Sequence, residues 1–232
     1  MFRLALLAFA LAMPSTMPAA KPAGKAVAAK TNWLATARRT AEGAIVIGNP
    51  AARVKLVEYL SLTCSHCADL SAEAMLPLQR DYIAKGLVSL EVRHAVRDPL
   101  DFTASLLLRC EPPPAYLGSI EALFATQATW FERAQKGIDG PAFEAFAPEL
   151  KIPAIAKAAG FDSFFARRGL TPRAQAVCMA SKPGQDQLSK MTSNSWDRDQ
   201  IPGTPAILIN GVRRDAILRW SQLESLIKEA LR

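Results

Sequence analysis

The chain has 232 residues, of which half are apolar and 21% are charged, a composition typical of a globular protein with a substantial core. Its formal net charge is +7, but the basic residues are scattered without a long Lys/Arg tract, so we expect no nucleic-acid partner. Four cysteines are too few for a scaffold held together by disulfides, and each has to be interpreted individually.

The first 20 residues have the pattern of a secretory signal peptide. Arg3 supplies a positive charge, residues 4–13 form an apolar run, and small residues with two prolines follow. The run is too short to span a bilayer as a helix. We therefore expect a signal peptide over 1–20, with its cleavage site left open, and an exported mature protein. Residues 21–43 predict a flexible leader, with a short helix over 32–40.

Five short segments that are apolar or alternate in polarity predict β-strands. Between the second and third, residues 65–85 have the pattern of a helix, in which Pro77 predicts a kink. Residues 220–231 predict an amphipathic C-terminal helix. The predicted strands cover residues 44–47, 54–60, 87–96, 204–210 and 212–217.

Residues 101–199 have helical patterns and little β character. Because strands precede and follow this helical block, the two halves of the sheet must pair across it. The simplest architecture is an α/β protein with one sheet and helices packed on it. We therefore expect one domain made of residues 44–100 and 200–232, interrupted by an inserted α-helical domain over 101–199.

The cysteine pair Cys64 and Cys67 lies where a predicted strand leads into a predicted helix. A helix N-terminus stabilises a thiolate through its unpaired N–H groups and its dipole. Cys64 comes first and is the expected nucleophile, and Cys67, one turn deeper, is the expected resolving thiol. His66 between them is expected to favour the thiolate further. A stabilised reduced form makes the disulfide a stronger oxidant.

Two other interpretations of the cysteine pair are disfavoured by the sequence. A zinc site needs further ligands, but the chain has no second Cys-x-x-Cys motif and only two histidines, His66 and His94. We therefore expect no metal and no cofactor. An inert disulfide between residues three apart would close only a very small loop.

Residues 58–67 (EYLSLTCSHC) and 203–211 (GTPAILING) carry a family resemblance. The first segment resembles the active site of the DsbA-like proteins, which are periplasmic thiol-disulfide oxidoreductases of the thioredoxin fold. The second resembles their cis-proline loop with the strand that follows. The resemblance extends over residues 44–232. It implies a thioredoxin fold with an inserted α-helical domain and a periplasmic location.

The resemblance also assigns roles to individual residues. Cys64 corresponds to the nucleophile at the surface and Cys67 to its buried partner. His66 corresponds to the histidine that stabilises the thiolate. Pro205 corresponds to the cis-proline beside the disulfide. Glu58 corresponds to a carboxylate beneath the active site that influences proton transfer, with a solvent-facing Glu58 as the alternative.

The function implied by this resemblance is the donation of disulfides to folding exported proteins, with re-oxidation by a quinone-linked, DsbB-like membrane partner. The chain departs from the best-known oxidases at Ser65, where they have proline. Thr204, before the expected cis-proline, is also similar to isomerases and other reductive relatives. A periplasmic reductase or isomerase therefore remains an alternative. A peptide-binding chaperone with a vestigial Cys-x-x-Cys motif is the alternative from another functional class.

The two remaining cysteines, Cys110 and Cys178, both lie in the helical block. In an oxidising compartment two isolated thiols in one subdomain are expected to pair, so the sequence predicts a structural disulfide between them. Two buried free thiols, or a bridge that modulates the redox potential, remain as alternatives.

Overall fold

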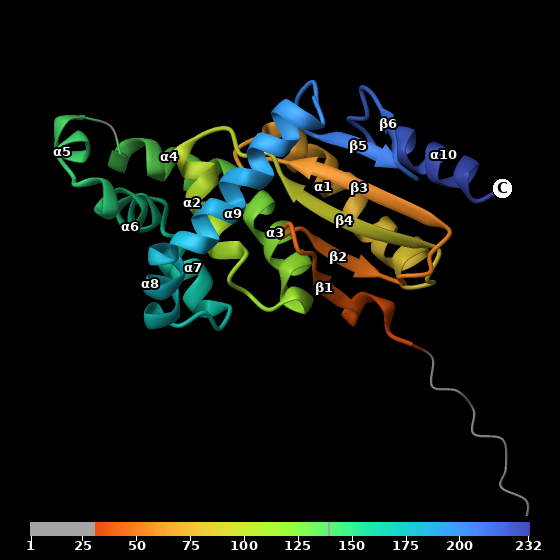
Figure 1. The fold of residues 1–232 in the computed structure, drawn as a ribbon, viewed down its shortest axis with the longest axis horizontal. Helices are drawn as coiled ribbons and strands as arrows, with labels where there is room; N and C mark the ends of the chain where they lie inside the picture. Colours follow the sequence, from red (N-terminus) through yellow and green to blue (C-terminus); the bar gives the residue numbers. More distant parts are fainter. Residues whose placement is uncertain (1–30, 139) are drawn as a thin grey trace, which may run out of the picture. The chain divides into compact units, whose positions relative to one another are not determined.

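The computed structural model describes residues 31–138 and 140–232, and within them the chain builds a six-stranded β-sheet (Figure 1). Strands β3 and β4 are parallel, and every other neighbouring pair is antiparallel. Across the sheet the order is β1 (Ala37–Arg39), β2 (Ile45–Gly48), β4 (Val88–His94), β3 (Val54–Leu60), β5 (Ala206–Ile209) and β6 (Val212–Arg214).

Strand β3 lies at the centre of the sheet, and all of its residues except Lys55 are buried. A strand covered on both faces is expected to be rich in apolar residues, and β3 has five apolar or aromatic residues besides Lys55 and the buried Glu58. On one side β3 pairs with β4, which follows it closely in the sequence. On the other side Tyr59 pairs with Ala206 of β5, so the two halves of the sheet meet across the helical block, as predicted.

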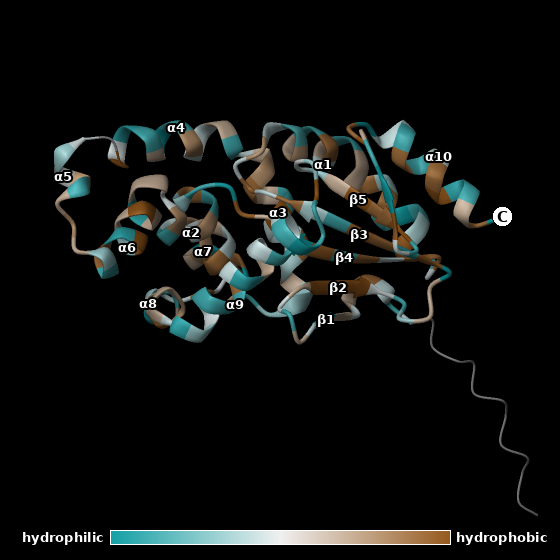
Figure 2. Cartoon of the chain, turned by 45° about the horizontal axis from the view of Figure 1, so that its top comes forward, coloured by the Kyte–Doolittle hydropathy of each residue, from teal (hydrophilic) through white to brown (hydrophobic). Residues whose placement is uncertain are grey.

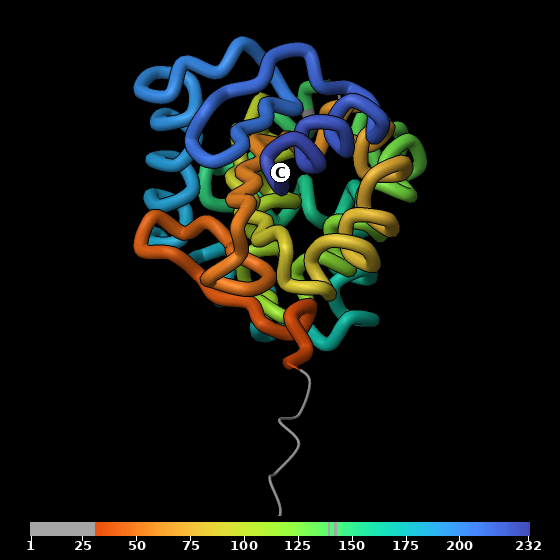
Figure 3. Tube along the Cα trace, turned by 90° about the vertical axis from the view of Figure 1, so that its right-hand side faces the viewer, coloured from red at the N-terminus to blue at the C-terminus, as the bar shows by residue number. Residues whose placement is uncertain are grey.

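Helices cover both faces of the sheet. Helix α1 (Ser65–Pro77) follows β3 and passes into a π-helical turn (Leu78–Ile83) after Pro77, where the kink was predicted. Figures 1 and 3 show α1 and α9 on opposite faces of the sheet. The C-terminal helix α10 (Trp220–Ala230) buries Leu223 and Ile227.

A block of helices separates β4 from β5, and in Figure 1 most of it lies beyond one end of the sheet. Its helices are α2 (Pro99–Leu108), α3 (Tyr116–Ala125), α4 (Gln127–Ile138), α5 (Pro141–Glu144), α6 (Pro148–Ala159), α7 (Phe161–Arg167), α8 (Pro172–Ala180) and α9 (Lys182–Ser193). Short 3₁₀ or π turns lie at Trp33–Ala35, Pro113–Ala115 and Asn194–Arg198.

The sheet and the helical block share one apolar core. A single cluster of buried side chains runs from Leu60 of β3 through Leu100 of α2 to Phe161 of α7. Figure 2 shows the hydrophobic colour concentrated on β2 and mostly hydrophilic residues along α4, which faces solvent on one side. The fold is therefore a thioredoxin-type sheet with helices inserted between its two halves. The exact division into residues 44–100, 101–199 and 200–232 stays a prediction.

The N-terminal part of the described chain differs from the expected leader. Of the helix expected over 32–40, only Trp33–Ala35 is helical, as a 3₁₀ turn, and Ala37–Arg39 instead forms strand β1 and pairs with β2. The sequence ARR carries little β pattern, and the free edge of β2 supplies the hydrogen-bonding partners that make it a strand. The expected signal peptide and residues 21–30 of the leader lie outside the described residues. None of the helices in the described ranges has the length and apolar character needed to cross a membrane.

Candidate active site

The cysteine pair begins helix α1 directly after the loop that follows β3. Cys64 is the N-cap residue, with extended backbone angles (φ −86°, ψ 119°). Its N–H donates to the carbonyl oxygen of Ser61, and its own carbonyl accepts from the N–H of Ala68, each at 3.2 Å. Cys67 lies in the first turn and is completely buried. The sequence predicts both cysteines at this strand-to-helix junction, because an apolar run followed directly by a helical pattern is enough to locate the junction.

The sulfur of Cys64 is strongly favoured as a thiolate. The hydrogen bond from the Cys67 side chain is the largest cause that lowers the pKa of Cys64 from 9 to about 5. Burial opposes this shift, whereas Thr204, the backbone N–H of Cys67 and the positive charge of Arg97 support it. At neutral pH Cys64 is therefore mostly ionised, and the thiolate is the nucleophilic form of cysteine.

Cys67 has the opposite character. Burial, the hydrogen bond to Cys64 and the charge of Glu58 raise the pKa of Cys67 well above its usual value. Cys67 therefore keeps its proton when Cys64 has lost its own. This asymmetry is consistent with the prediction that Cys64 is the attacking sulfur and Cys67 the resolving one, which stays a prediction. With 3% of its surface exposed, Cys64 is less open than the surface position implied by the family resemblance.

Glu58 of β3 is buried, 5% exposed, rather than solvent-facing. Burial raises the pKa of its carboxyl from 4.5 to about 7, because the apolar surroundings disfavour the charged form. The charge of Glu58 also contributes to the raised pKa of Cys67. A carboxyl group that titrates near neutral pH has the pKa suited to proton transfer, the role that the family resemblance predicts for Glu58.

We expect the Glu58→Gln variant to be more stable than the wild type at alkaline pH. Because the folded-state pKa is raised, the ionisation of Glu58 costs nothing below pH 4.5, and stability is lost as the pH rises through about 7. This loss amounts to at most about 3 kcal/mol, at 1.4 kcal/mol per pKa unit. Urea unfolding near pH 4 and near pH 8 measures it. A stability difference between variant and wild type that does not grow from the lower to the higher pH contradicts a buried, titrating Glu58.

The loop before β5 closes over the cysteine pair. The peptide bond between Thr204 and Pro205 is cis. The sulfur of Cys64 lies 3.1 Å from the carbonyl oxygen of Thr204, to which it donates a hydrogen bond in its protonated form. Among the described residues, the buried hydroxyl of Thr204 has no hydrogen-bond partner, and a thiolate at Cys64 supplies an acceptor for it. Thr204 and Pro205, far away in the sequence, are thus brought to the nucleophile.

Ser65 and His66 are both exposed at the start of α1. In the described part of the chain, no hydrogen bond joins the imidazole of His66 to another residue, so its expected effect on the thiolate stays a prediction. His94, the other histidine, is buried and contacts Tyr116 and Ser105. Within the described ranges, no three side chains of the metal-ligating types lie together.

Several residues that act on the active-site loop were not among the predicted site residues. Arg97 acts on Cys64 through its charge. Asp98 accepts a hydrogen bond from the hydroxyl of Thr63 at 2.5 Å. Asp101 and Gln127 bind the backbone of the loop. Asp98, in front of a proline and the apolar start of a helix, has the sequence signal of an N-cap. The other contacts arise only in the folded structure.

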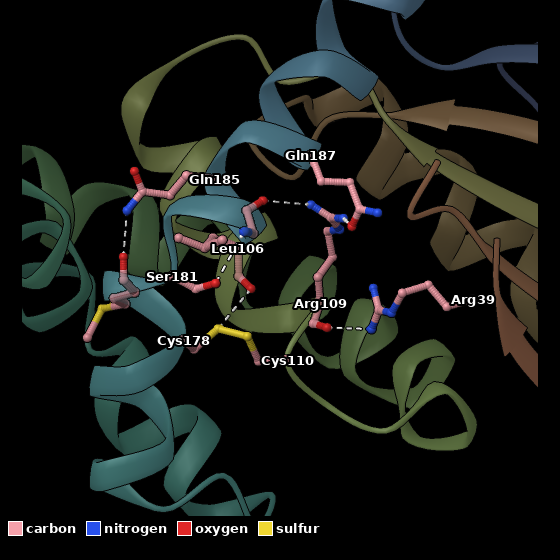
Figure 4. The surroundings of a disulfide bond; sticks show 10 residues. Arg39, Leu106, Arg109, Cys110, Cys178, Ser181, Gln185 and Gln187 are labelled. Atoms are coloured by element: carbon pink, nitrogen blue, oxygen red, sulfur yellow. Dashed lines mark hydrogen bonds between the residues drawn. A yellow bond between two sulfur atoms is a disulfide. The ribbon is translucent and has the colours of Figure 1, made fainter. Parts of the chain in front are cut away.

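Cys110 and Cys178 are joined by a disulfide in the helical block (Figure 4). Cys110 follows the end of α2, and Cys178 lies in α8, with 6.2 Å between their Cα atoms. Cys110 is exposed and Cys178 is buried. Figure 4 shows the bridge beside Arg109, whose carbonyl accepts a hydrogen bond from Arg39. The disulfide thus links the segment after α2 to α8 through two cysteines that are 68 residues apart in the sequence.

The solved structures similar to this chain have the same fold. A structure titled protein-disulfide isomerase from Novosphingobium aromaticivorans is 28% identical, with a TM-score of 0.73, and the match covers 81% of this chain and 96% of the other. Alpha-DsbA1 from Wolbachia pipientis is 19% identical with a TM-score of 0.63, covering 80% of this chain and 89% of the other. The second match shows the fold alone.

Curated relatives and a family profile extend the comparison. A Rickettsia bellii protein provisionally named protein-disulfide oxidoreductase is 22% identical over 174 residues, which is 75% of this chain. The chain spans about 60% of the length of that relative. The profile of the family described as Thioredoxin matches residues 40–229, which include every strand from β2 to β6 and both active-site segments. The chain therefore belongs to the thioredoxin family and has the fold of its DsbA-type members.

Proposed function

We propose that the protein is a thiol-disulfide oxidoreductase that donates its Cys64–Cys67 disulfide to exported proteins as they fold. The observation that carries this proposal is the position of Cys64 at the N-terminus of α1, where its pKa is lowered to about 5. Stabilising the thiolate stabilises the reduced pair, which makes the disulfide a strong oxidant. The proposal names no cofactor, because the sulfur pair itself carries the two electrons.

The reaction consists of two exchange steps. A substrate thiolate attacks the sulfur of Cys64, the Cys64–Cys67 bond breaks, and Cys67 leaves and takes up a proton. Glu58, with a pKa of about 7, is a nearby donor for that proton. A second substrate thiolate then attacks the substrate sulfur bound to Cys64, and Cys64 leaves as a stable thiolate. Two electrons pass to the cysteine pair, and the substrate gains one disulfide.

We also propose that the protein is exported and that a redox partner re-oxidises its cysteine pair. The apolar N-terminal segment supports passage through a secretory route to the periplasm, where disulfides persist. The names of the Rickettsia relative and of the Novosphingobium structure support chemistry on protein disulfides. After each turnover the reduced pair has to lose two electrons, and a quinone-linked membrane partner of the DsbB type is the proposed acceptor.

The second candidate function is a reductase or isomerase, and it is favoured by Thr204 and by the isomerase name of the Novosphingobium structure. Thr204 lies against the sulfur of Cys64. Ser65 replaces a proline of the best-known oxidases and adds a backbone donor next to Cys64. Both residues act on the redox potential, and therefore the potential decides between the two directions of electron flow.

The proposed function is tested by mixing the oxidised protein with an equal amount of a reduced, unfolded substrate. The substrate is expected to gain one disulfide for each Cys64–Cys67 pair reduced, and the Cys64→Ala variant is expected to transfer none. If the wild type transfers no disulfide, yet both proteins prevent aggregation of the substrate equally, the protein is a chaperone and the proposal is wrong. Transfer of electrons from the reduced protein to a substrate disulfide, without the forward reaction, identifies a reductase.

A further inference from the structure

The backbone just before Cys64 is held by two side chains of the helical block. The N–H of Leu62 donates to Oδ1 of Asp101 at 2.9 Å. The carbonyl oxygen of the same residue accepts from Nε2 of Gln127 at 2.7 Å. Nε2 of Gln127 also donates to the carbonyl oxygen of Cys64, at 3.0 Å. Gln127 therefore bridges two carbonyl groups, one of which belongs to the nucleophile itself.

These side-chain contacts replace the backbone hydrogen bonds that a β-strand makes with its neighbours in a sheet. Strand β3 ends at Leu60, and helix α1 begins at Ser65, so the residues between them lack regular partners for their backbone groups. Buried backbone groups need partners, and Leu62 is completely buried. Asp101 from α2 and Gln127 from α4 supply partners from outside the sheet. The position of Cys64 thus depends on the inserted helices as well as on β3.

Asp101 is itself firmly held, which makes it a rigid support. Its Oδ2 accepts from the N–H of Arg97 at 3.1 Å, and its Oδ1 accepts from the hydroxyl of Ser105 at 3.1 Å. Its own N–H donates to the Asp98 side chain at 2.8 Å. Since Asp101 is completely buried, these contacts are shielded from water, and the Leu62 peptide is fixed on one side by Asp101 and on the other by Gln127.

We propose that Gln127 is a positioning residue for Cys64: opposite Asp101, it holds the carbonyl groups of Leu62 and Cys64 so that the nucleophilic sulfur stays at the N-terminus of α1. At that position the side chain and backbone N–H of Cys67 and the side chain of Thr204 donate to the sulfur and favour its thiolate form. The field of the helix end also falls off within one turn. A small displacement of the Cys64 backbone therefore weakens every interaction that favours the thiolate. This inference rests on the proposed function, whose chemistry uses that thiolate.

Gln127→Met is the most direct test, because methionine keeps the length of the side chain and removes its donor. Two readouts are measured on the full-length protein: the thiolate absorbance of Cys64 against pH, and the equilibrium of the cysteine pair with glutathione. We expect the pKa of Cys64 to rise by about one unit, the size of one lost hydrogen bond. The equilibrium is expected to shift about tenfold toward the disulfide, a potential lower by about 30 mV.

Gln175→Met is the matched control. The amide of Gln175 also donates to two backbone carbonyls, those of Asp162 at 2.9 Å and Leu170 at 2.8 Å, inside the same helical block but away from Cys64. It is expected to lose comparable stability and to leave both redox readouts unchanged. Gln127→Asn, which keeps an amide on a shorter chain, is expected to shift both readouts in the same direction and serves if the methionine variant does not fold.

The outcomes separate this inference from the proposed function. Redox readouts for Gln127→Met within about twofold of the wild type, or an equal shift in Gln175→Met, overturn the positioning role of Gln127. A wild-type cysteine pair that does not exchange with glutathione at all overturns the proposed function instead. A shift confined to the Gln127 variants supports the inference, because a residue with a merely structural role does not change the pKa of one sulfur.

Discussion

Replacing Cys64 with serine is expected to lower the rate of disulfide exchange by at least about 10³-fold, since the attacking thiolate is removed. Cys67→Ser is expected to behave differently. This variant keeps the thiolate of Cys64 but lacks the sulfur that releases a bound substrate, so it should accumulate a mixed disulfide between Cys64 and the substrate. Non-reducing electrophoresis and intact mass after mixing with a substrate disulfide measure both effects.

The asymmetry of the two sulfurs is the physical basis of this expectation. Cys64 has a pKa of about 5, whereas burial raises the pKa of Cys67. Only the first sulfur is ionised at neutral pH, and only the thiolate attacks. If Cys64→Ser instead traps the substrate and Cys67→Ser does not, the two cysteines have the opposite roles. Serine is the matched replacement in both cases, because it keeps the shape of the side chain.

Removing the disulfide between Cys110 and Cys178 is expected to have the largest effect on stability. The bridge closes a loop of 68 residues, which in the chain-entropy description stabilises the folded state by about 4 kcal/mol. The Cys110→Ala/Cys178→Ala double variant should therefore unfold at lower urea concentration, with a free energy of unfolding lower by about that amount. The slope of the unfolding free energy against urea reports any change in the denatured state.

Two outcomes contradict this account of the bridge. Two alkylatable thiols besides Cys64 and Cys67 in the oxidised wild type mean that no disulfide forms there. A double variant as stable as the wild type means that the bridge has no stabilising role. The same variant also tests whether the bridge modulates redox behaviour, since its glutathione equilibrium can be compared directly with that of the wild type.

The sequence predicted those parts of the active site that local patterns specify. An apolar run, a pair of cysteines and a helical segment follow one another from Val54 to Pro77, so the junction that carries Cys64 could be located from the sequence alone. The position of Pro205 beside it followed from a family resemblance and not from a physical pattern. Strand β1 was missed because its three residues become a strand only through the edge of β2.

The supports of the active-site loop could not be predicted for a related reason. Asp101 and Gln127 meet Leu62 across 39 and 65 residues of sequence, and neither belongs to a motif. Their hydrogen bonds exist because a loop between strand and helix leaves backbone groups without partners. In the folded chain, side chains of the neighbouring helices α2 and α4 supply the missing hydrogen-bond partners. Such tertiary contacts produce no periodic pattern in a single sequence from which they could be predicted.

The reduction potential of the Cys64–Cys67 pair, measured by equilibration with glutathione at pH 7, tests the central claim most directly. A protein that donates disulfides, with a thiolate stabilised as Cys64 is here, is expected to have a potential near about −120 mV. A value near about −270 mV, typical of a reductant, would contradict the account and would mean that electrons flow from this protein to its substrates.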